Sequence, residues 1–350
     1  MSSPAQHAPI PPRTSREVRL ASVPDTLPRP EDLSVVETPA PVPGTDEVLL
    51  RNRFFHVFPA LRTLMGDSVE DAPLPPLRVG DTLFGGAIGE VVSAPAGATV
   101  RPGDLVSHSQ GWREYAVVPA SEAAPLGDVL PDPAAHLSQG STAYDALTDA
   151  AGVRPGDTVF VSGAAGSLGS MAGQIARLLG AGRVVGSTSI QAKADRLVAD
   201  LGYDAVLLRG RDDEPVAGQL AKAAPDGIDV YFDNVGGEQL QAAVAAARPG
   251  ARFVLLGALS SQLSPVRPSP SAPVEIDSFA VILKRLRIRG FSGLDTAPSV
   301  RAEWTERFAE WLRAGAISFP HVRIKGIENA PQALYDAAAG KHLGTVVVAL

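Results

Sequence analysis

Residues 158–169 read TVFVSGAAGSLG: an apolar strand runs through a turn of small residues directly into a helix. The small residues Ala164, Gly166 and Gly169 have the spacing of a dinucleotide fingerprint in which alanine replaces the first glycine. Such a turn brings the backbone close to a diphosphate, and the N-terminus of the following helix offers free N–H groups and a partial positive charge. The turn therefore predicts a dinucleotide site, with a purely structural glycine-rich turn as the alternative.

The sequence beyond this turn alternates between apolar strands and helices. The predicted strands are residues 158–162, 183–186, 205–208, 228–232 and 252–256, and the predicted helices are residues 167–179, 191–201, 215–224 and 238–247. Continuous apolar strands joined by helices indicate a parallel sheet that is covered on both faces. We therefore predict an α/β fold with a doubly wound, Rossmann-type sheet.

The sequence on either side of this region has a different pattern of apolar residues. From Glu17 to about Pro119, short apolar runs are separated by glycine and proline, which is typical of a mostly β barrel or sandwich. The Pro- and Ser-rich stretch 260–273 predicts a loop that covers a site, and it is followed by a strand at 286–291, an amphipathic helix and a closing strand at 345–349.

The length of 350 residues suits two domains. We predict a β domain over residues 1–129, with a loose leader at 1–13, a Rossmann domain over 130–318, and a return to the β domain over 319–350. No apolar run reaches the roughly 18 residues of a membrane span, and the leader does not resemble a signal peptide. We expect a cytoplasmic protein with no membrane partner.

Charge and cysteine content exclude several functions. The chain has 31 basic and 38 acidic residues, a net charge of −7 and no basic run, which excludes a protein built to neutralise nucleic acid. It has no cysteine, so disulfides, thiolate nucleophiles and sulfur-ligated zinc are excluded. We predict no metal site, and we expect His56 to be a packing or pocket residue.

The end of the second predicted strand indicates which nicotinamide carrier is bound. NAD-binding proteins place an acidic residue about 20 positions beyond the glycine turn, where it contacts the ribose 2′-hydroxyl. Here that position falls on Gly186-Ser187-Thr188-Ser189, which has no acid, and Lys193 follows in the first turn of the next helix. Small hydroxyl residues leave room for a 2′-phosphate and a lysine meets its charge, so the sequence predicts NADPH rather than NADH.

Several motifs outside the turn also occur together in one known family. They are Arg51-Asn52, Gly111–Ala116, Thr142-Ala143-Tyr144, Gly173–Ala176, Phe232-Asp233-Asn234-Val235-Gly236-Gly237, Gly257-Ala258, Gly326–Pro331, and Gly344 with its valine strand. With these motifs the chain, from about Thr14 onward, resembles the zinc-free branch of the medium-chain dehydrogenase/reductase superfamily. Within that branch it is most similar to leukotriene B4 dehydrogenases, prostaglandin reductases and NADP-dependent alkenal double-bond reductases.

The resemblance implies a GroES-like barrel domain built from both chain ends, a Rossmann domain between them, and a homodimer formed through Rossmann edge strands, here residues 286–291. It implies that a diphosphate is held by Gly166, Ser167, Leu168 and Gly169, and the 2′-phosphate by Lys193, with Arg209 in place of a family tyrosine. The remaining implied cofactor contacts are Thr142, Asn234, Leu256, Gly257, Ala258, Leu259, Ser260, Phe291 and His342.

The reaction that the resemblance implies is hydride transfer from NADPH to the β-carbon of an α,β-unsaturated carbonyl, a small electrophilic substrate. The enolate that forms is then protonated. A quinone or carbonyl reductase of the same superfamily is the first alternative, and a non-catalytic NADPH-binding protein is the second. The double-bond reductase could act within a biosynthetic pathway.

Departures from the family pattern leave the substrate open. Gln262 occupies the position where the branch has a tyrosine that donates to the enolate; an amide can donate there but cannot supply a proton. Tyr144 and Tyr115 could supply the phenol, although both positions also suit packing. We expect Asp233 to bind nearby backbone N–H groups rather than to act as an acid. His342 and Thr345 replace a family asparagine and lysine, and Ala60 replaces an aromatic residue.

Overall fold

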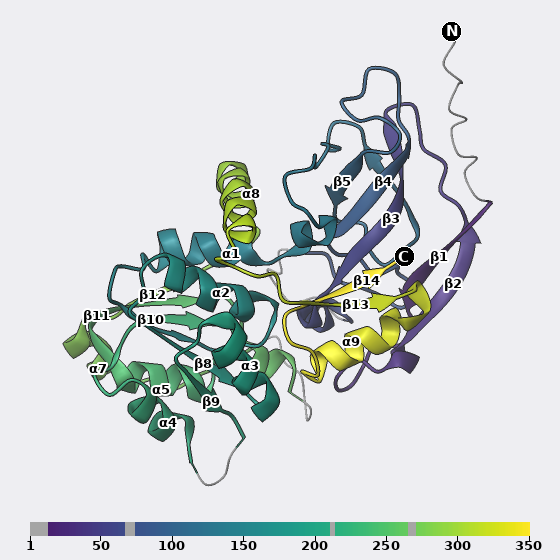
Figure 1. Cartoon of the computed structure of the whole chain (residues 1–350). Helices are drawn as coiled ribbons and strands as arrows, with labels where there is room; N and C mark the ends of the chain where they lie inside the picture. Colours follow the sequence, from purple (N-terminus) through teal and green to yellow (C-terminus); the bar gives the residue numbers. More distant parts are fainter. Residues whose placement is uncertain (1–12, 67–73, 211–213, 265–270) are drawn as a thin grey trace. The chain divides into compact units, whose positions relative to one another are not determined.

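The computed structural model describes residues 13–66, 74–210, 214–264 and 271–350. The chain divides into two compact units (Figure 1). Unit 1 comprises residues 1–137, 323–339 and 346–350, and unit 2 comprises residues 138–322 and 340–345. The predicted leader at 1–13 therefore lies almost entirely outside the described residues.

Unit 1 is mostly β structure. Among the described residues, one six-stranded sheet has the order β13-β14-β3-β4-β5, with β6 paired to β3, and a second sheet is formed by β1 and β2. The strands are β1 (Thr14–Leu20), β2 (Leu33–Pro39), β3 (Glu47–Val57), β4 (Ala87–Ser93), β5 (Leu105–His108), β6 (Tyr115–Pro119), β13 (His321–Lys325) and β14 (Thr345–Ala349). The closing strand β14 runs antiparallel to β3, with Val347 opposite His56. Helix α9 (Ala330–Ala338) contributes Leu334 to the core around Phe55 and Trp112.

Unit 2 contains a six-stranded sheet of order β12-β11-β10-β7-β8-β9, in which every described pair is parallel. Its strands are β7 (Thr158–Val161), β8 (Arg183–Thr188), β9 (Ala205–Leu208), β10 (Ile228–Asp233), β11 (Ala247–Leu255) and β12 (Arg287–Gly290). The order places β7 beside both β8 and β10, so the chain leaves the middle of the sheet in two directions. This is the doubly wound arrangement, in which ligands bind beyond the carboxyl ends of the central strands.

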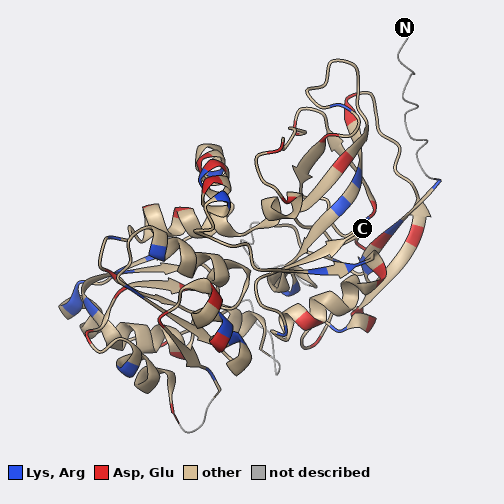
Figure 2. Ribbon diagram, in the orientation of Figure 1, with Lys and Arg blue, Asp and Glu red and all other residues tan. Residues whose placement is uncertain are grey.

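The helices of unit 2 fall into two groups. Helix α2 contacts α1 and α3, whereas α5 contacts α4 and α7, so the two groups cover the two faces of the sheet (Figure 1). Their bounds are α1 (Gly140–Asp145), α2 (Ser167–Leu178), α3 (Gln191–Leu201), α4 (Val216–Ala223), α5 (Glu238–Ala246), α6 (Leu259–Gln262), α7 (Ser278–Lys284) and α8 (Pro298–Arg313). Acidic and basic residues are interspersed along α8 (Figure 2), as expected of a partly solvated helix.

The core of unit 2 explains why the strands could be predicted. All four residues of β7 are buried, and Phe160 stacks on Tyr231 with ring centroids 5.1 Å apart. Tyr231 in turn meets Phe253 edge to face at 5.3 Å, which ties β7, β10 and β11 together. Strands buried on both faces need continuous apolar runs, and these are the runs that the sequence shows.

Two elements differ from the sequence-based expectation. The short helix α6 begins the stretch 260–273 that we predicted as a loop, and residues 265–270 of that stretch lie outside the described residues. Helix α7 was not predicted; it begins where the Asp277 carboxylate accepts hydrogen bonds from the amides of Phe279 and Ala280. Both helices are too short to give a hydrophobic period that can be read from sequence.

The predicted fold class, a doubly wound parallel sheet with a mostly β barrel-like domain, is confirmed. The described helices include none with the length and apolar character that crossing a membrane would require.

Candidate functional site

The turn between β7 and α2 is closed so tightly that glycine is required at its end. A Cβ atom on Gly169 would lie 2.4 Å from the carbonyl oxygen of Gly163 and 2.6 Å from the Cα atom of Ala164. Gly163 itself has a φ of +62°, which favours glycine. A Cβ on the exposed Gly166 would meet nothing closer than 3.5 Å, so this part of the turn faces open space.

Helix α2 presents unused amides at this turn. No side chain caps the helix, and none of the residues that the structure describes accepts a hydrogen bond from the amides of Ser167, Leu168 or Gly169. Free N–H groups at the start of a 12-residue helix attract an anion. The geometry of the turn therefore fits a diphosphate, the group for which a fingerprint of this kind is built.

The end of β10 is held to the end of β7 by the buried residue Asp233. Its Oδ1 atom accepts hydrogen bonds from the Ser162 and Tyr231 hydroxyls, each at 2.8 Å, and from the amides of Val235 and Gly236 at 2.9 and 2.8 Å. Burial and the Asp233 charge raise the pKa of Tyr231. The prediction that Asp233 serves nearby backbone N–H groups is confirmed.

Asn234 connects β10 to the segment that follows β11. Its Nδ2 atom donates to the Ser162 carbonyl at 2.7 Å, while its buried Oδ1 atom has no donor among the described residues. The carbonyl of Asn234 accepts from the amide of Leu259 at 3.2 Å, and a Cβ on Gly257 would lie 2.7 Å from the same oxygen. The structure therefore brings together Asn234 and the predicted contacts Leu256, Gly257, Ala258, Leu259 and Ser260.

Lys193 is buried on the first turn of α3. Its Nζ atom donates to the backbone carbonyls of Gly340 and His342, so both residues lie beside it. Burial lowers the pKa of Lys193 to about 8. An ammonium group has three hydrogens, and two of them are used in these contacts. Lys193 is therefore held in place by the chain and keeps one hydrogen for a further acceptor.

Arg209 lies beside the end of β8, because its amide donates to the carbonyl of Thr188 at 2.8 Å. Its side-chain Nε atom is buried and has no acceptor among the residues that the structure covers. Burial lowers the pKa of Arg209, and the charge of Glu238 partly opposes this. A buried guanidinium N–H without an acceptor costs free energy, and a phosphate oxygen would remove that cost.

The segment after β12 contacts the end of β11 through Phe291 and contacts Thr142 through Gly293. The amide of Phe291 donates to the carbonyl of Leu255 at 2.9 Å, which places Phe291 at the end of β11. A Cβ on Gly293 would lie 2.6 Å from the Oγ1 atom of Thr142, so the two residues are in close contact. All the predicted cofactor contacts belong to unit 2.

The structure gives Tyr144 a packing position. Its hydroxyl donates to the Glu303 carboxylate at 2.8 Å, and its ring packs on Trp304 and Trp311 at 5.8 and 6.3 Å. Burial and the hydrogen bond to Glu303 raise the pKa of Tyr144. Tyr144 therefore joins α1 to α8. Gln262 is half-buried at the end of α6, and Tyr115 is half-buried on β6.

His56 of unit 1 lies in apolar surroundings. His56 is buried on β3 against Phe58, with ring centroids 5.9 Å apart, and burial lowers its pKa to about 4. Within the described ranges no group of three His, Asp or Glu side chains could hold a metal ion.

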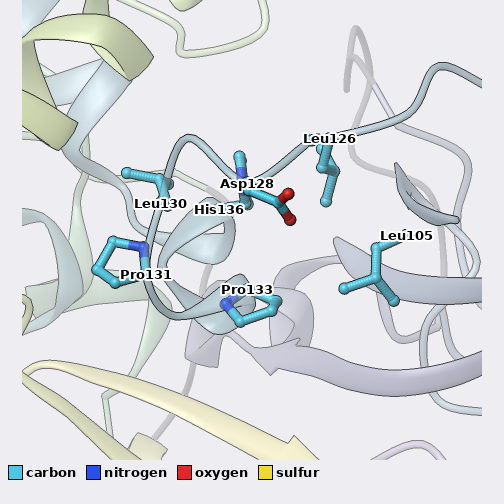
Figure 3. Close-up of a pocket in the computed structure, with 8 residues that line it drawn as sticks. Leu105, Leu126, Asp128, Leu130, Pro131, Pro133 and His136 are labelled. Atoms are coloured by element: carbon cyan, nitrogen blue, oxygen red, sulfur yellow. The ribbon is translucent and has the colours of Figure 1, made fainter.

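A pocket in unit 1 (Figure 3) contains none of the predicted site residues. It is lined by Leu105, Leu126, Gly127, Asp128, Leu130, Pro131, Pro133 and His136.

Residues 340–345 are the part of the site that sequence reasoning missed. Only His342 was expected there, and residues 319–350 were assigned together to the β domain. The structure groups 340–345 with unit 2, because Gly344 donates to the carbonyl of Ala165 at 2.9 Å and Thr345 pairs with Ser167. These contacts join residues far apart in sequence, and the local signals were the departures from the family at His342 and Thr345.

Two family models match the chain. Residues 16–126 match the N-terminal domain of oxidoreductases, and residues 167–314 match a family described as zinc-binding dehydrogenase. The second description names zinc, but this chain has no cysteine.

Three relatives extend the match over nearly the whole chain. The NADPH-dependent curcumin reductase of Escherichia coli is 32% identical over 94% of this chain and 95% of its own length. Bovine prostaglandin reductase 1 is 33% identical over 91% of this chain and 93% of its own. The crystal structure of CurA from Vibrio vulnificus in complex with NADPH is 32% identical, with a TM-score of 0.86 over 95% of this chain and 98% of that one. The chain therefore belongs to the zinc-free branch of the medium-chain dehydrogenase/reductase superfamily, a family of oxidoreductases.

Proposed function

We propose that this chain binds NADPH and reduces the carbon–carbon double bond of a small α,β-unsaturated carbonyl compound. The observation that carries the proposal is the set of polar groups in unit 2 that keep unused hydrogen-bonding capacity. The free amides at the start of α2 suit a diphosphate, and Lys193 and Arg209 suit a 2′-phosphate. The sequence offers no acid at the end of β8 to bind a free 2′-hydroxyl.

Each part of the cofactor has residues that would hold it. The amides of Ser167, Leu168 and Gly169 would bind the diphosphate, and Lys193 and Arg209 the 2′-phosphate. Asn234, with its free Oδ1 atom, and the segment 256–260 would bind the ribose and nicotinamide. Thr142, Phe291 and His342 complete the set of proposed contacts. When bound, NADPH supplies the hydride, and the chain orients it and stabilises the charge that develops on the substrate.

Gln262 is the proposed contact to the developing enolate. Its amide N–H can stabilise a negative oxygen by donating a hydrogen bond. It cannot give up a proton near neutral pH, so protonation must use another donor, such as solvent. Replacing Gln262 by tyrosine should raise the rate of double-bond reduction if this position faces the enolate, and an unchanged rate would count against its assignment.

The names of the similar proteins favour double-bond reduction. One is a curcumin reductase and another a prostaglandin reductase. A quinone or carbonyl reductase remains the first alternative and a non-catalytic NADPH-binding protein the second; the loss of the tyrosine at Gln262 motivates the latter.

The test is to mix the protein and NADPH with a panel of enals, enones and quinones. We expect NADPH oxidation with an activated alkene and a product saturated at the former double bond, identified by NMR. A product reduced at the carbonyl would favour the first alternative. Tight NADPH binding without turnover across the panel would favour the second. A parallel series with NADH should be much slower.

We also propose that the chain is a homodimer formed through the β12 edge of the unit 2 sheet. Every residue of β12 is exposed, and α7 nearby exposes Phe279, Ile282 and Leu283 by 64%, 68% and 58%. Such a group of apolar side chains beside an open strand edge favours association. Light scattering should give a dimer mass, and Ile282→Glu should shift it to the monomer; a monomeric wild-type chain would contradict the proposal.

A further inference from the structure

Residues 340–345 form a strap that follows α9 and ends at Thr345, the first residue of β14 (Figure 1). The strap belongs to unit 2, while the residues on both sides of it belong to unit 1. It is fixed at one end by Lys193, which donates to the carbonyls of Gly340 and His342, and at the other end by Gly344, whose amide donates to Ala165. The strap therefore lies along both parts of the proposed nucleotide site.

Glycine is required at the second end of the strap. Gly344 has a φ of +83°, and a Cβ there would lie 2.0 Å from the carbonyl oxygen of Pro320. The same carbonyl accepts from the amide of Thr345 at 2.9 Å. The backbone of Thr345 is thus fixed, and its side chain is completely buried with no exposed surface.

The hydroxyl of Thr345 has a single described hydrogen-bond partner. Its Oγ1 atom lies 2.7 Å from the Oγ atom of Ser167, the first residue of α2. A hydroxyl hydrogen that is buried away from water must be given to an acceptor, or its desolvation is not compensated. Thr345 therefore donates, and Ser167 accepts. Ser167 is half-exposed, so its own hydroxyl hydrogen is free for a ligand at the start of the helix.

We propose that Thr345 is a positioning residue for diphosphate recognition: its buried hydroxyl donates to Ser167 and thereby directs the Ser167 hydroxyl hydrogen toward the diphosphate of the dinucleotide. This inference rests on the proposed NADPH binding. The diphosphate is then bound by backbone amides and by one oriented hydroxyl. The lysine that Thr345 replaces in the family pattern would act there as a cation rather than as a neutral donor.

The two ends of the strap serve different parts of the dinucleotide. Thr345 serves the diphosphate, which NADP and NAD share, whereas Lys193 serves the 2′-phosphate, which only NADP carries. Two ligand fragments report on the two ends independently. ADP-ribose contains the diphosphate without a 2′-phosphate, and adenosine 2′-monophosphate contains the 2′-phosphate without a diphosphate.

The experiment measures the dissociation constants of both fragments by calorimetry for the wild type, Thr345→Val and Thr345→Ser. Valine has nearly the shape of threonine but no hydroxyl. In this variant the half-exposed Ser167 hydroxyl can form a hydrogen bond with water instead, so no buried polar group is left without a partner. We expect Thr345→Val to weaken ADP-ribose binding by roughly fivefold to tenfold and to leave adenosine 2′-monophosphate binding unchanged. Thr345→Ser should bind both fragments as the wild type does. Lys193→Met should weaken the binding of adenosine 2′-monophosphate and leave the binding of ADP-ribose unchanged.

A double-mutant cycle adds a second readout. Ser167→Ala should weaken ADP-ribose binding at least as much as Thr345→Val, and the double variant should be no weaker than Ser167→Ala alone, because Thr345 acts only through Ser167. Additive losses would overturn the proposal.

Two further outcomes would overturn the inference alone. One is wild-type affinity of Thr345→Val for ADP-ribose. The other is an equal loss for both fragments, which would show a merely structural role. If the wild type binds neither fragment, the proposed function itself fails and the role of Thr345 fails with it.

Discussion

The two units of this protein contain polar clusters of opposite kinds. In unit 1, His108 Nδ1 accepts from the Gln110 amide at 3.1 Å, so Nε2 carries the ring hydrogen and donates to Asn52 Oδ1 at 2.8 Å. Asn52 Nδ2 donates in turn to the carbonyls of Gln110 and Arg113 at 3.0 and 2.8 Å. Both side chains have every polar atom paired.

In unit 2, by contrast, the polar groups of the candidate site include atoms that have no hydrogen-bond partner. Among the described residues, the amides at the start of α2, Nε of Arg209 and Oδ1 of Asn234 have no partner. A buried polar group without a partner is costly. The comparison indicates that the complete cluster stabilises the fold, whereas under the proposed function a dinucleotide would supply the missing partners in unit 2. Changes to the unpaired groups of unit 2 should therefore affect binding, and changes to the Asn52–His108 cluster of unit 1 should affect stability.

The largest effect is expected from Gly169→Ala. The new Cβ would clash with the backbone of Gly163 and Ala164 and would push α2 away from the turn. We expect a loss of about 3 kcal/mol in the free energy of unfolding and no measurable NADP binding by calorimetry. Gly166→Ala is the matched control, because its Cβ meets nothing closer than 3.5 Å. It should fold normally and should only weaken NADP binding; normal binding by Gly169→Ala would contradict the tight turn.

Asn52→Leu tests the complete cluster of unit 1. It leaves His108 and the carbonyls of Gln110 and Arg113 without Asn52, and we expect it to lower the free energy of unfolding by about 2 kcal/mol. Urea unfolding measures this loss. Calorimetry on the folded variant should show unchanged NADP affinity. A large loss of affinity at unchanged stability would remove the distinction between the two clusters.

Lys193→Met tests whether the lysine beside the unpaired groups of unit 2 selects between NADP and NAD. Methionine keeps most of the apolar stem of lysine but removes the charged ammonium group, so NADP affinity should fall by about tenfold to 100-fold. NAD affinity should stay within about twofold, because NAD has no group at this position. Equal losses for the two carriers would place Lys193 outside the 2′-phosphate site.

The pH dependence of binding follows from the same lysine. Burial lowers the pKa of Lys193 to about 8, and a bound phosphate would favour the charged form and raise that pKa again. Below pH 8 the lysine is already charged, and above pH 8 binding must take up a proton. NADP affinity should therefore fall by up to about tenfold per pH unit above 8. Lys193→Met should lose this dependence, and its persistence there would assign it to another group.

The smallest effect is expected from Arg209→Gln. Glutamine keeps a donor but not the charge, and Lys193 still meets the phosphate, so NADP affinity should fall by about fivefold. Thermal unfolding should change little, or the variant should be slightly more stable, since a half-buried guanidinium whose Nε atom has no acceptor among the described residues has been removed. Marked destabilisation would show that Arg209 has a structural partner.

The sequence was sufficient to predict the elements that depend on the order of neighbouring residues. The strands around Phe160 and Tyr231 are buried on both faces, and helix α3 was predicted at its observed bounds, Gln191–Leu201. The tight turn at Gly169 follows from three spaced small residues, because its contacts lie within six positions of one another.

The sequence was insufficient where the site depends on distant contacts. Lys193 was predicted to meet only a phosphate, yet it is also held by the carbonyls of Gly340 and His342, about 150 positions away. Tyr144 could not be placed without knowing that α8 brings Glu303 to its hydroxyl. Backbone carbonyls carry no signature in a sequence, so the strap was visible only in the structure.

The most direct test of the candidate site in unit 2 is a calorimetric titration of the wild-type protein with NADP and then with NAD at pH 7. If the unpaired groups of unit 2 form a diphosphate site beside a 2′-phosphate site, NADP should bind at least about tenfold more tightly than NAD. Equal affinities, or no binding of either carrier, would contradict this account.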